Sequence, residues 1–174
     1  VLFRSIRNVD SYPDVRRRSV IELAERCAWE ADHSKQVAAI ALTLFDYTKR
    51  LHGLGDRERE WLEYAALLHD IGNHISYEKH HRHSYYLIKN GDLRGFEPAE
   101  IDMIALLTRY HRRATPKREH IGLTDLAKRQ RRAVQTLSGF LRLAETLDRS
   151  RHGVVRGIEA RERMGQLSIK VQAV

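Results

Sequence analysis

The sequence predicts a mostly α-helical protein, a helical bundle that is followed by a small C-terminal β-hairpin. Through residues 15–150, apolar side chains recur at intervals of three, four and seven, which is typical of amphipathic helices. Glycine, proline and asparagine separate these runs and suit the ends of helices. After Gly153 the pattern changes to an alternation of apolar and polar residues, which is typical of strands.

Four helices are expected in the first half of the chain. Pro13 suits the first turn of the first helix, whose apolar face carries Val20, Leu23 and Cys27. Gly72 is a natural stop for the third helix. The expected helices cover residues 13–28, 32–51, 57–71 and 80–89.

Two further helices and the hairpin are expected in the second half. Pro98 suits the start of one helix, and Thr115-Pro116 interrupts the chain after it. A longer helix follows, with Val134 and Leu141 on its inner face. The expected helices cover residues 98–111 and 125–149, and the expected strands cover residues 154–159 and 166–172.

These elements divide the chain into three parts. Residues 1–14 are expected to be a linker or a lead-in from an upstream region, residues 15–150 the helical domain, and residues 151–174 the hairpin appendage. The chain starts at Val1 and stops inside the alternating pattern. We therefore expect a piece of a longer protein with a truncated hairpin.

The composition places the chain among globular proteins. Its 174 residues are enough for one domain, and 42% hydrophobic with 31% charged residues argues against disorder. No apolar run is long enough to span a membrane, so no membrane partner is expected. Cys27 is the single cysteine, which excludes an internal disulfide and a cysteine-rich zinc site and suggests the cytoplasm.

The chain is basic, with 31 Lys and Arg against 23 Asp and Glu and a net charge of +8. Residues 109–132 hold nine of the basic residues and only two acidic ones. One interpretation is a solvated loop and an exposed helix start. The other is a surface that binds polyanions, such as polyphosphate or nucleotides.

Polar residues that can bind metals interrupt the apolar stripes of five expected helices. Taken singly, each has an ordinary explanation: a buried histidine can simply be hydrogen-bonded, and Asp148 could cap a helix or pair with Arg149 or Arg151. Together they indicate a shared cation, because burying several such groups is costly without one. Imidazole and carboxylate suit Mn, Fe, Zn, Co or Ni better than Ca or Mg alone. The residues are His33, His69, Asp70, His80, His111 and Asp148.

The order of these residues resembles a known superfamily. His33, then His69-Asp70, then Asp148 is similar to the H…HD…D signature of the HD superfamily of metal-dependent phosphohydrolases. The block from His69 to Ile88 and the later Arg109-Tyr110-His111-Arg112 resemble the HD-type C-terminal domain of the exopolyphosphatase/guanosine pentaphosphatase (Ppx/GppA) family. This resemblance covers about residues 15–174 and implies an HD-domain helical bundle.

The resemblance also implies roles for individual residues. His33, His69, Asp70 and Asp148 would bind one divalent ion, while His80 and His111 would help to bind a second, which Asp70 would bridge. Asp70 and His69 would be catalytic, with Mn, Fe, Zn, Ni, Co or Mg as the metal. Outside this set, His81 and His83 would be supporting donors or alternative ligands. Anionic substrate would contact Arg109, Arg112, Arg113 and Lys117.

The chain departs from the family pattern in two ways. HD phosphohydrolases often read HD-x-G-K, and Asn73 stands where that lysine would be. The family's main phosphatase machinery lies in actin-like domains with glycine-rich phosphate loops, and this sequence has no G-x-G-x-x-G motif and no P-loop.

Two functions therefore stay open. The first is an enzyme, a metal-dependent phosphohydrolase that acts on polyphosphate, guanosine tetra- or pentaphosphate, other nucleotides or other phosphate esters and anhydrides. The second is a non-catalytic module that binds polyphosphate or nucleotide for an actin-like partner domain. A nucleic-acid binder is disfavoured, because aromatic and basic residues do not interleave. The sequence leaves open the identity of the metal, the natural substrate and whether two copies form a homodimer.

Overall fold

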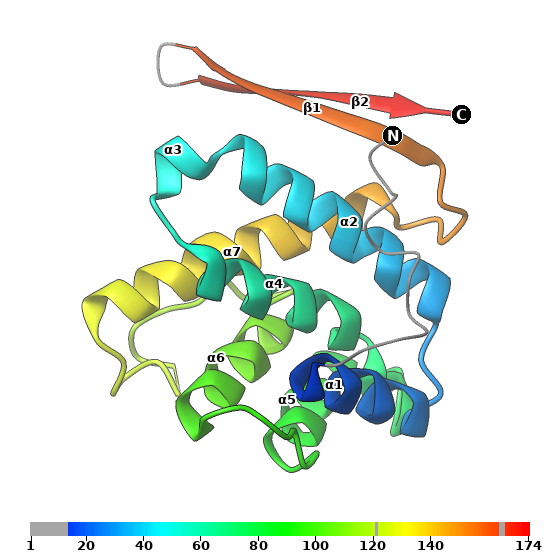
Figure 1. Cartoon of the computed structure of the whole chain (residues 1–174), viewed down its shortest axis with the longest axis vertical. Coiled ribbons are helices and arrows are strands. Elements are labelled where there is room, and N and C mark those ends of the chain that lie inside the picture. Colours follow the sequence, from blue (N-terminus) through cyan, green and yellow to red (C-terminus); the bar gives the residue numbers. More distant parts are fainter. Residues whose placement is uncertain (1–13, 121, 164–165) are drawn as a thin grey trace.

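The computed structural model describes residues 14–120, 122–163 and 166–174 as a helical bundle with a two-stranded antiparallel hairpin (Figure 1). The predicted fold class, mostly helical with a small C-terminal hairpin, is confirmed. The helices are α1 (Val15–Arg26), α2 (Ala31–Tyr47), α3 (Lys49–His52), α4 (Asp56–Leu68), α5 (His80–Lys89), α6 (Pro98–Arg109) and α7 (Lys128–Leu147), with a short 3-10 helix, η2 (Ile71–His74), after α4. The strands are β1 (Val155–Arg163) and β2 (Gln166–Ala173).

Helices α2 and α4 pack against each other and against α7, and they form the centre of the bundle. Their contact faces carry fully buried apolar side chains such as Leu44, Leu62, Leu68 and Val134. Helices α5 and α6 pack as a second pair, which joins the centre through contacts of α6 with α4 and α7. The two layers bring the ends of α4, α6 and α7 and the starts of α2 and α5 to the candidate site.

Arg16 fastens α1 to the rest of the bundle. Its guanidinium lies 2.7 Å from a carboxylate oxygen of Glu60 on α4 and 3.0 Å from one of Glu100 on α6, and it stacks on the ring of Phe96. The hydrogen bonds from Arg16 lower the pKa of Glu100 to about 2. This network of charge-assisted hydrogen bonds ties three helices together.

The hairpin lies over α2, as Figure 1 shows at the top of the molecule. Val155, Ile158 and Ala160 of β1 are buried, whereas every residue of β2 except the half-buried Ile169 is exposed. Gln36 on α2 donates a hydrogen bond to the backbone carbonyl of Val155. The first strand therefore fixes the hairpin to the bundle, and the second strand pairs with the first.

Several predicted boundaries were wrong by a few residues. The helix expected over 32–51 stops at Tyr47, where the hydroxyl of Thr48 donates to the carbonyl of Leu44, and a separate turn, α3, follows. The helix expected over 125–149 is shorter, Lys128–Leu147. The first helix starts at Val15 with the side chain of Asp14 as its N-cap. Pro13, expected to start it, lies outside the described residues.

Gly72 does not end α4 as expected. The helix stops at Leu68, and the hydroxyl of Ser84 on α5 forms hydrogen bonds with backbone groups of the turn that follows the helix. This hydroxyl accepts from the Gly72 amide at 2.9 Å and donates to the His69 carbonyl at 2.7 Å. A Cβ atom on Gly72 would lie 2.1 Å from the His80 carbonyl oxygen. Glycine is needed here because the turn and α5 approach so closely.

Candidate metal centre

Two groups of histidines and carboxylates converge at the centre of the bundle. Within each group, one possible ligand atom per residue lies within 4.8 Å of the corresponding atom of every other member. Asp70 belongs to both groups, so the two groups share one carboxylate. The first group is His33, His69, Asp70 and Glu145, and the second is Asp70, His80 and His111.

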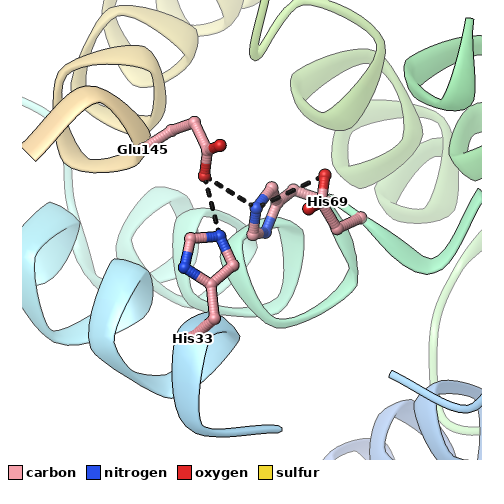
Figure 2. A group of neighbouring side chains, drawn as sticks. His33, His69 and Glu145 are labelled. Carbon is pink, nitrogen blue, oxygen red and sulfur yellow. Dashed lines mark hydrogen bonds and ion pairs between the residues drawn. The ribbon is translucent and has the colours of Figure 1, made fainter. Parts of the chain in front are cut away.

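In the first group, Glu145 on α7 lies between two imidazoles (Figure 2). Its Oε2 atom is 3.0 Å from Nε2 of His33 and 3.0 Å from Nε2 of His69. His33 comes from the start of α2, and His69 follows the last residue of α4. Three elements distant in sequence therefore place their side chains around one point.

In the second group, two imidazole nitrogens and one carboxylate oxygen face one another. Nε2 of His80 lies 3.0 Å from Oδ1 of Asp70 and 3.3 Å from Nε2 of His111. Oδ1 of Asp70 is also 3.7 Å from Nε2 of His111 and 3.6 Å from Nε2 of His69. This oxygen is buried and has no hydrogen-bond partner.

The backbone fixes how these rings point. Nδ1 of His69, His80 and His111 lies 2.7, 3.1 and 2.6 Å from the carbonyl oxygens of Ala66, Tyr77 and Thr108. A carbonyl oxygen only accepts, so each Nδ1 carries the proton and, in a neutral ring, each Nε2 carries a lone pair. Two lone pairs and an unpaired carboxylate oxygen then meet in the second group. A cation satisfies such an arrangement, and the residues fit a metal ion.

The charge states suit a metal as well. Burial opposes ionisation of Asp70 and Glu145, but neighbouring histidines outweigh it and hold both pKa values well below their usual range. Burial, together with the charge of His69, lowers the pKa of His111 to about 3. Burial opposes protonation of His69 too, yet Asp70 and Glu145 raise its pKa to about 9. Burial opposes protonation of His33 as well, but hydrogen bonds with Glu145 and Asp148 raise its pKa. The centre thus holds two carboxylates, one neutral imidazole and two imidazoles that compete with an ion for a proton.

Asp148 lies behind His33 instead of beside the other ligand atoms. Its Oδ2 is 2.7 Å from Nδ1 of His33, and its Oδ1 accepts from the Gly153 amide at 3.1 Å. Both carboxylate oxygens are thereby used. In this geometry Asp148 orients His33 and leaves Nε2 of that ring for an ion, as carboxylates often do for metal-binding histidines.

Neither of the two predicted supporting histidines belongs to the two ligand groups. His81 is buried, its ring centroid is 6.2 Å from that of His80, and its Nδ1 has no hydrogen-bond partner. Burial lowers the pKa of His81 to about 4, so the ring is neutral. His83 is half-buried on the same helix.

A cleft of about 350 Å³ opens onto both groups. Five arginines line it, so an anion that enters the cleft meets positive charge next to the candidate ligands. Arg142 donates to the carbonyls of Arg113 and Ala114, which ties the loop after α6 to α7. The lining residues are Tyr77, His80, His111, Arg112, Arg113, Arg142, Glu145, Thr146, Arg149 and Arg151.

The four residues predicted to contact substrate divide into two pairs. Arg112 and Arg113 line the cleft. Arg109 instead lies over the ring of Tyr85, at 5.3 Å from its centroid, and the exposed Lys117 is on the loop beyond the lining residues.

Sequence reasoning missed Glu145 and three of the arginines. Glu145 lies four residues after Leu141 and seven after Ser138, which is the spacing that drew attention to the other ligands. Arg142 comes from the preceding turn of α7. Arg149 and Arg151 come from the turn after that helix, whose path the sequence does not indicate.

The fold and the site together define a helical-bundle protein in which a candidate metal centre lies beneath a cleft that suits anionic ligands. The family model for Ppx/GppA phosphatase, domain III, matches residues 15–172. The chain belongs to the Ppx/GppA phosphatase family, and this part of the prediction is confirmed. None of the helices in the described part of the chain is long and apolar enough to cross a membrane.

Proposed function

We propose that this chain is a metal-dependent phosphohydrolase domain of the HD type, in an exopolyphosphatase- or guanosine pentaphosphatase-like protein. The observation that carries the proposal is the shared carboxylate: Asp70 joins two ligand groups directly beneath a cleft with five arginines. Membership of the Ppx/GppA family supports phosphate compounds as the substrates.

Each part of the site has a role in this proposal. His33, His69, Asp70 and Glu145 would hold one divalent ion, and Asp70, His80 and His111 a second. Divalent ions supply Lewis acidity, which activates water as a nucleophile and stabilises charge on phosphoryl oxygens.

The arginines bind the remaining phosphates of the substrate. Arg112 and Arg113 come from the loop after α6, and Arg149 from the turn after α7, so they contact an anion from two sides of the cleft. Guanidinium groups bind phosphate oxygens in a bidentate manner and orient the phosphoryl group over the ligand groups.

The alternative is a module that binds polyphosphate or nucleotide without hydrolysis. Asn73 favours it, because the HD-x-G-K pattern has a lysine at this position and Asn73 brings no positive charge next to Asp70. In that case the arginines bind the anion and the ligand groups have a structural role.

Two variants separate these functions. Asp70→Ala should remove most of the bound metal, measured by elemental analysis of protein purified without chelator, and should abolish hydrolysis of a nucleotide, polyphosphate and bis(p-nitrophenyl) phosphate by Mn-loaded protein. Replacing Arg112 and Arg113 by Ala should leave the metal content unchanged, weaken polyphosphate binding and reduce its salt dependence by about one logarithmic unit of slope per lost phosphate contact.

Hydrolysis assays on the wild-type protein distinguish the enzyme from the binding module. Hydrolysis that depends on Asp70 supports the enzyme. Wild-type protein that carries metal and binds polyphosphate, but hydrolyses none of the three substrates, is the binding module. Full metal content in Asp70→Ala would contradict the assignment of the ligand groups.

A further inference from the structure

The two carboxylate oxygens of Asp70 have different surroundings. Oδ2 lies 2.6 Å from Nη2 of Arg151, whereas Oδ1 is buried without a hydrogen-bond partner and faces the imidazoles of His80 and His111. One oxygen is thus held by a guanidinium, and the other is free for an ion.

Arg151 is itself held at two points. Its Nη1 lies 2.6 Å from Oε2 of Glu30, the residue that precedes α2 and so lies three positions before His33. Its backbone adopts a left-handed conformation, with φ of 59°, in a turn where its amide donates to the Asp148 carbonyl at 2.8 Å. The side chain of Asp148 binds His33 from the same turn. Arg151 therefore connects Asp70 to the elements that carry His33 and Glu145.

We propose that Arg151 is a positioning residue for the metal centre. By binding Oδ2, it prevents rotation of the Asp70 carboxylate and leaves Oδ1 as the single oxygen that both ligand groups share. This inference rests on the proposed function, because it requires that ions bind to these groups. It assigns to Arg151 a role distinct from that proposed for Arg112, Arg113 and Arg149, which would contact the incoming anion.

Charge and orientation predict opposite effects when Arg151 is replaced. Removing a positive charge next to a cation site lowers electrostatic repulsion, so charge alone predicts tighter metal binding. Releasing the Asp70 carboxylate lets it turn Oδ1 away from the imidazoles, so the positioning role predicts weaker binding. Partners that orient metal ligands typically contribute 10- to 100-fold to affinity. The sign of the change therefore distinguishes the two effects.

The experiment measures Mn²⁺ and Co²⁺ affinity and stoichiometry by titration calorimetry, and the visible spectrum of the Co²⁺-loaded protein, for the wild type, Arg151→Gln and Arg151→Lys. Arg151→Gln should bind about 10- to 100-fold more weakly and change the Co²⁺ spectrum. Arg151→Lys keeps the charge and one contact, so it should recover part of the affinity. Glu30→Gln, which leaves Arg151 on Asp70 but removes its second anchor, should weaken binding less than Arg151→Gln.

Arg149→Gln is the matched control, since Arg149 lines the same cleft and is exposed. This variant measures the effect of losing one positive charge from the cleft, and its metal affinity should equal or slightly exceed that of the wild type. Equal or tighter binding by Arg151→Gln, or equal weakening in both glutamine variants, would overturn the proposal. Wild-type protein that takes up no ion would instead overturn the metal centre of the proposed function. Should Arg151→Gln fail to fold, Arg151→Lys and Glu30→Gln carry the same comparison.

Discussion

Glu145 and Asp148 lie three residues apart at the end of α7, yet their carboxylates have different partners. Glu145 faces Nε2 of both His33 and His69, whereas Asp148 binds Nδ1 of His33 from behind. The difference follows from helix geometry, because three residues amount to slightly less than one turn and place the two side chains on adjacent parts of one face. Of the two, the structure makes Glu145 the candidate ligand.

This assignment predicts different losses for two isosteric variants. Glu145→Gln removes a candidate ligand, so the ion of the first group should be lost, and the metal content by elemental analysis should fall by about one ion per chain. Asp148→Asn leaves the ligands in place but offers an N–H to Nδ1 of His33, which favours the wrong tautomer of that ring. Its metal affinity should fall about 10- to 100-fold without loss of stoichiometry at saturation. The reverse pattern would make Asp148 the ligand.

The sequence predicted a metal-binding carboxylate on this face of the helix but did not distinguish Glu145 from Asp148. Both residues follow the apolar stripe of α7 at helical spacing, Asp148 four residues after Ala144 and Glu145 four after Leu141. Periodicity defines a face about a third of the helix wide, and it does not say which residue on that face points at His33. That choice depends on where α7 crosses α2, which is a property of the packed bundle.

Among the elements, the contact between η2 and α5 decides whether the second ligand group can form. Gly72 and Ser84 hold the turn after Asp70 against the start of α5, which carries His80. A methyl group at Gly72 would lie 2.1 Å from the His80 carbonyl and 2.5 Å from the Ser84 amide. Both obstacles are backbone atoms, so α5 would have to move.

Gly72→Ala should therefore displace His80 from Asp70, destabilise the protein and remove the ion of the second group before that of the first. Denaturant unfolding and metal stoichiometry measure the two effects. Gly139→Ala is the control, because a Cβ there meets nothing within 4 Å on an exposed part of α7. That variant should gain up to about 1 kcal/mol from better helix propensity. A Gly72→Ala protein with full stability and two ions would contradict the steric argument.

Most of the elements could be predicted, because local periodicity specifies them. The helix over residues 80–89 was predicted at its observed bounds, and the hairpin was predicted from its alternation. The errors at helix ends have two causes. At the end of α2, Thr48 forms a local side-chain hydrogen bond with the Leu44 carbonyl, and after α4 the hydroxyl of Ser84, from another helix, binds the His69 carbonyl. Only Arg112 and Arg113 of the five cleft arginines were predicted, because the other three come from α7 and the turn after it, which meet the loop after α6 only in the folded chain.

For the whole molecule, the candidate centre joins α2, α4, α5, α6 and α7, so metal binding and global folding should be coupled. An ion that binds only the folded state stabilises it by about 4 kcal/mol at a thousandfold excess over its dissociation constant. For a chain of this size, chelator should then lower the melting temperature of metal-loaded protein by about 10 °C. Calorimetry of Asp70→Ala, with and without chelator, should show no such shift. A metal-containing wild type with an unchanged melting temperature would contradict the coupling.

The ligand groups also differ in how far apart their residues lie along the chain. His80 and His111 are separated by 31 residues, whereas His33 and Glu145 are separated by 112. At a synthesis rate of about 5 to 20 residues per second, the ribosome adds Glu145 about 6 to 22 s after His33. All residues of the second group are present once His111 has been added, whereas the first group stays incomplete until Glu145 is added. Because the first group includes Glu145, the ion proposed for it can bind only after α7 has been made and has packed against α2 and α4.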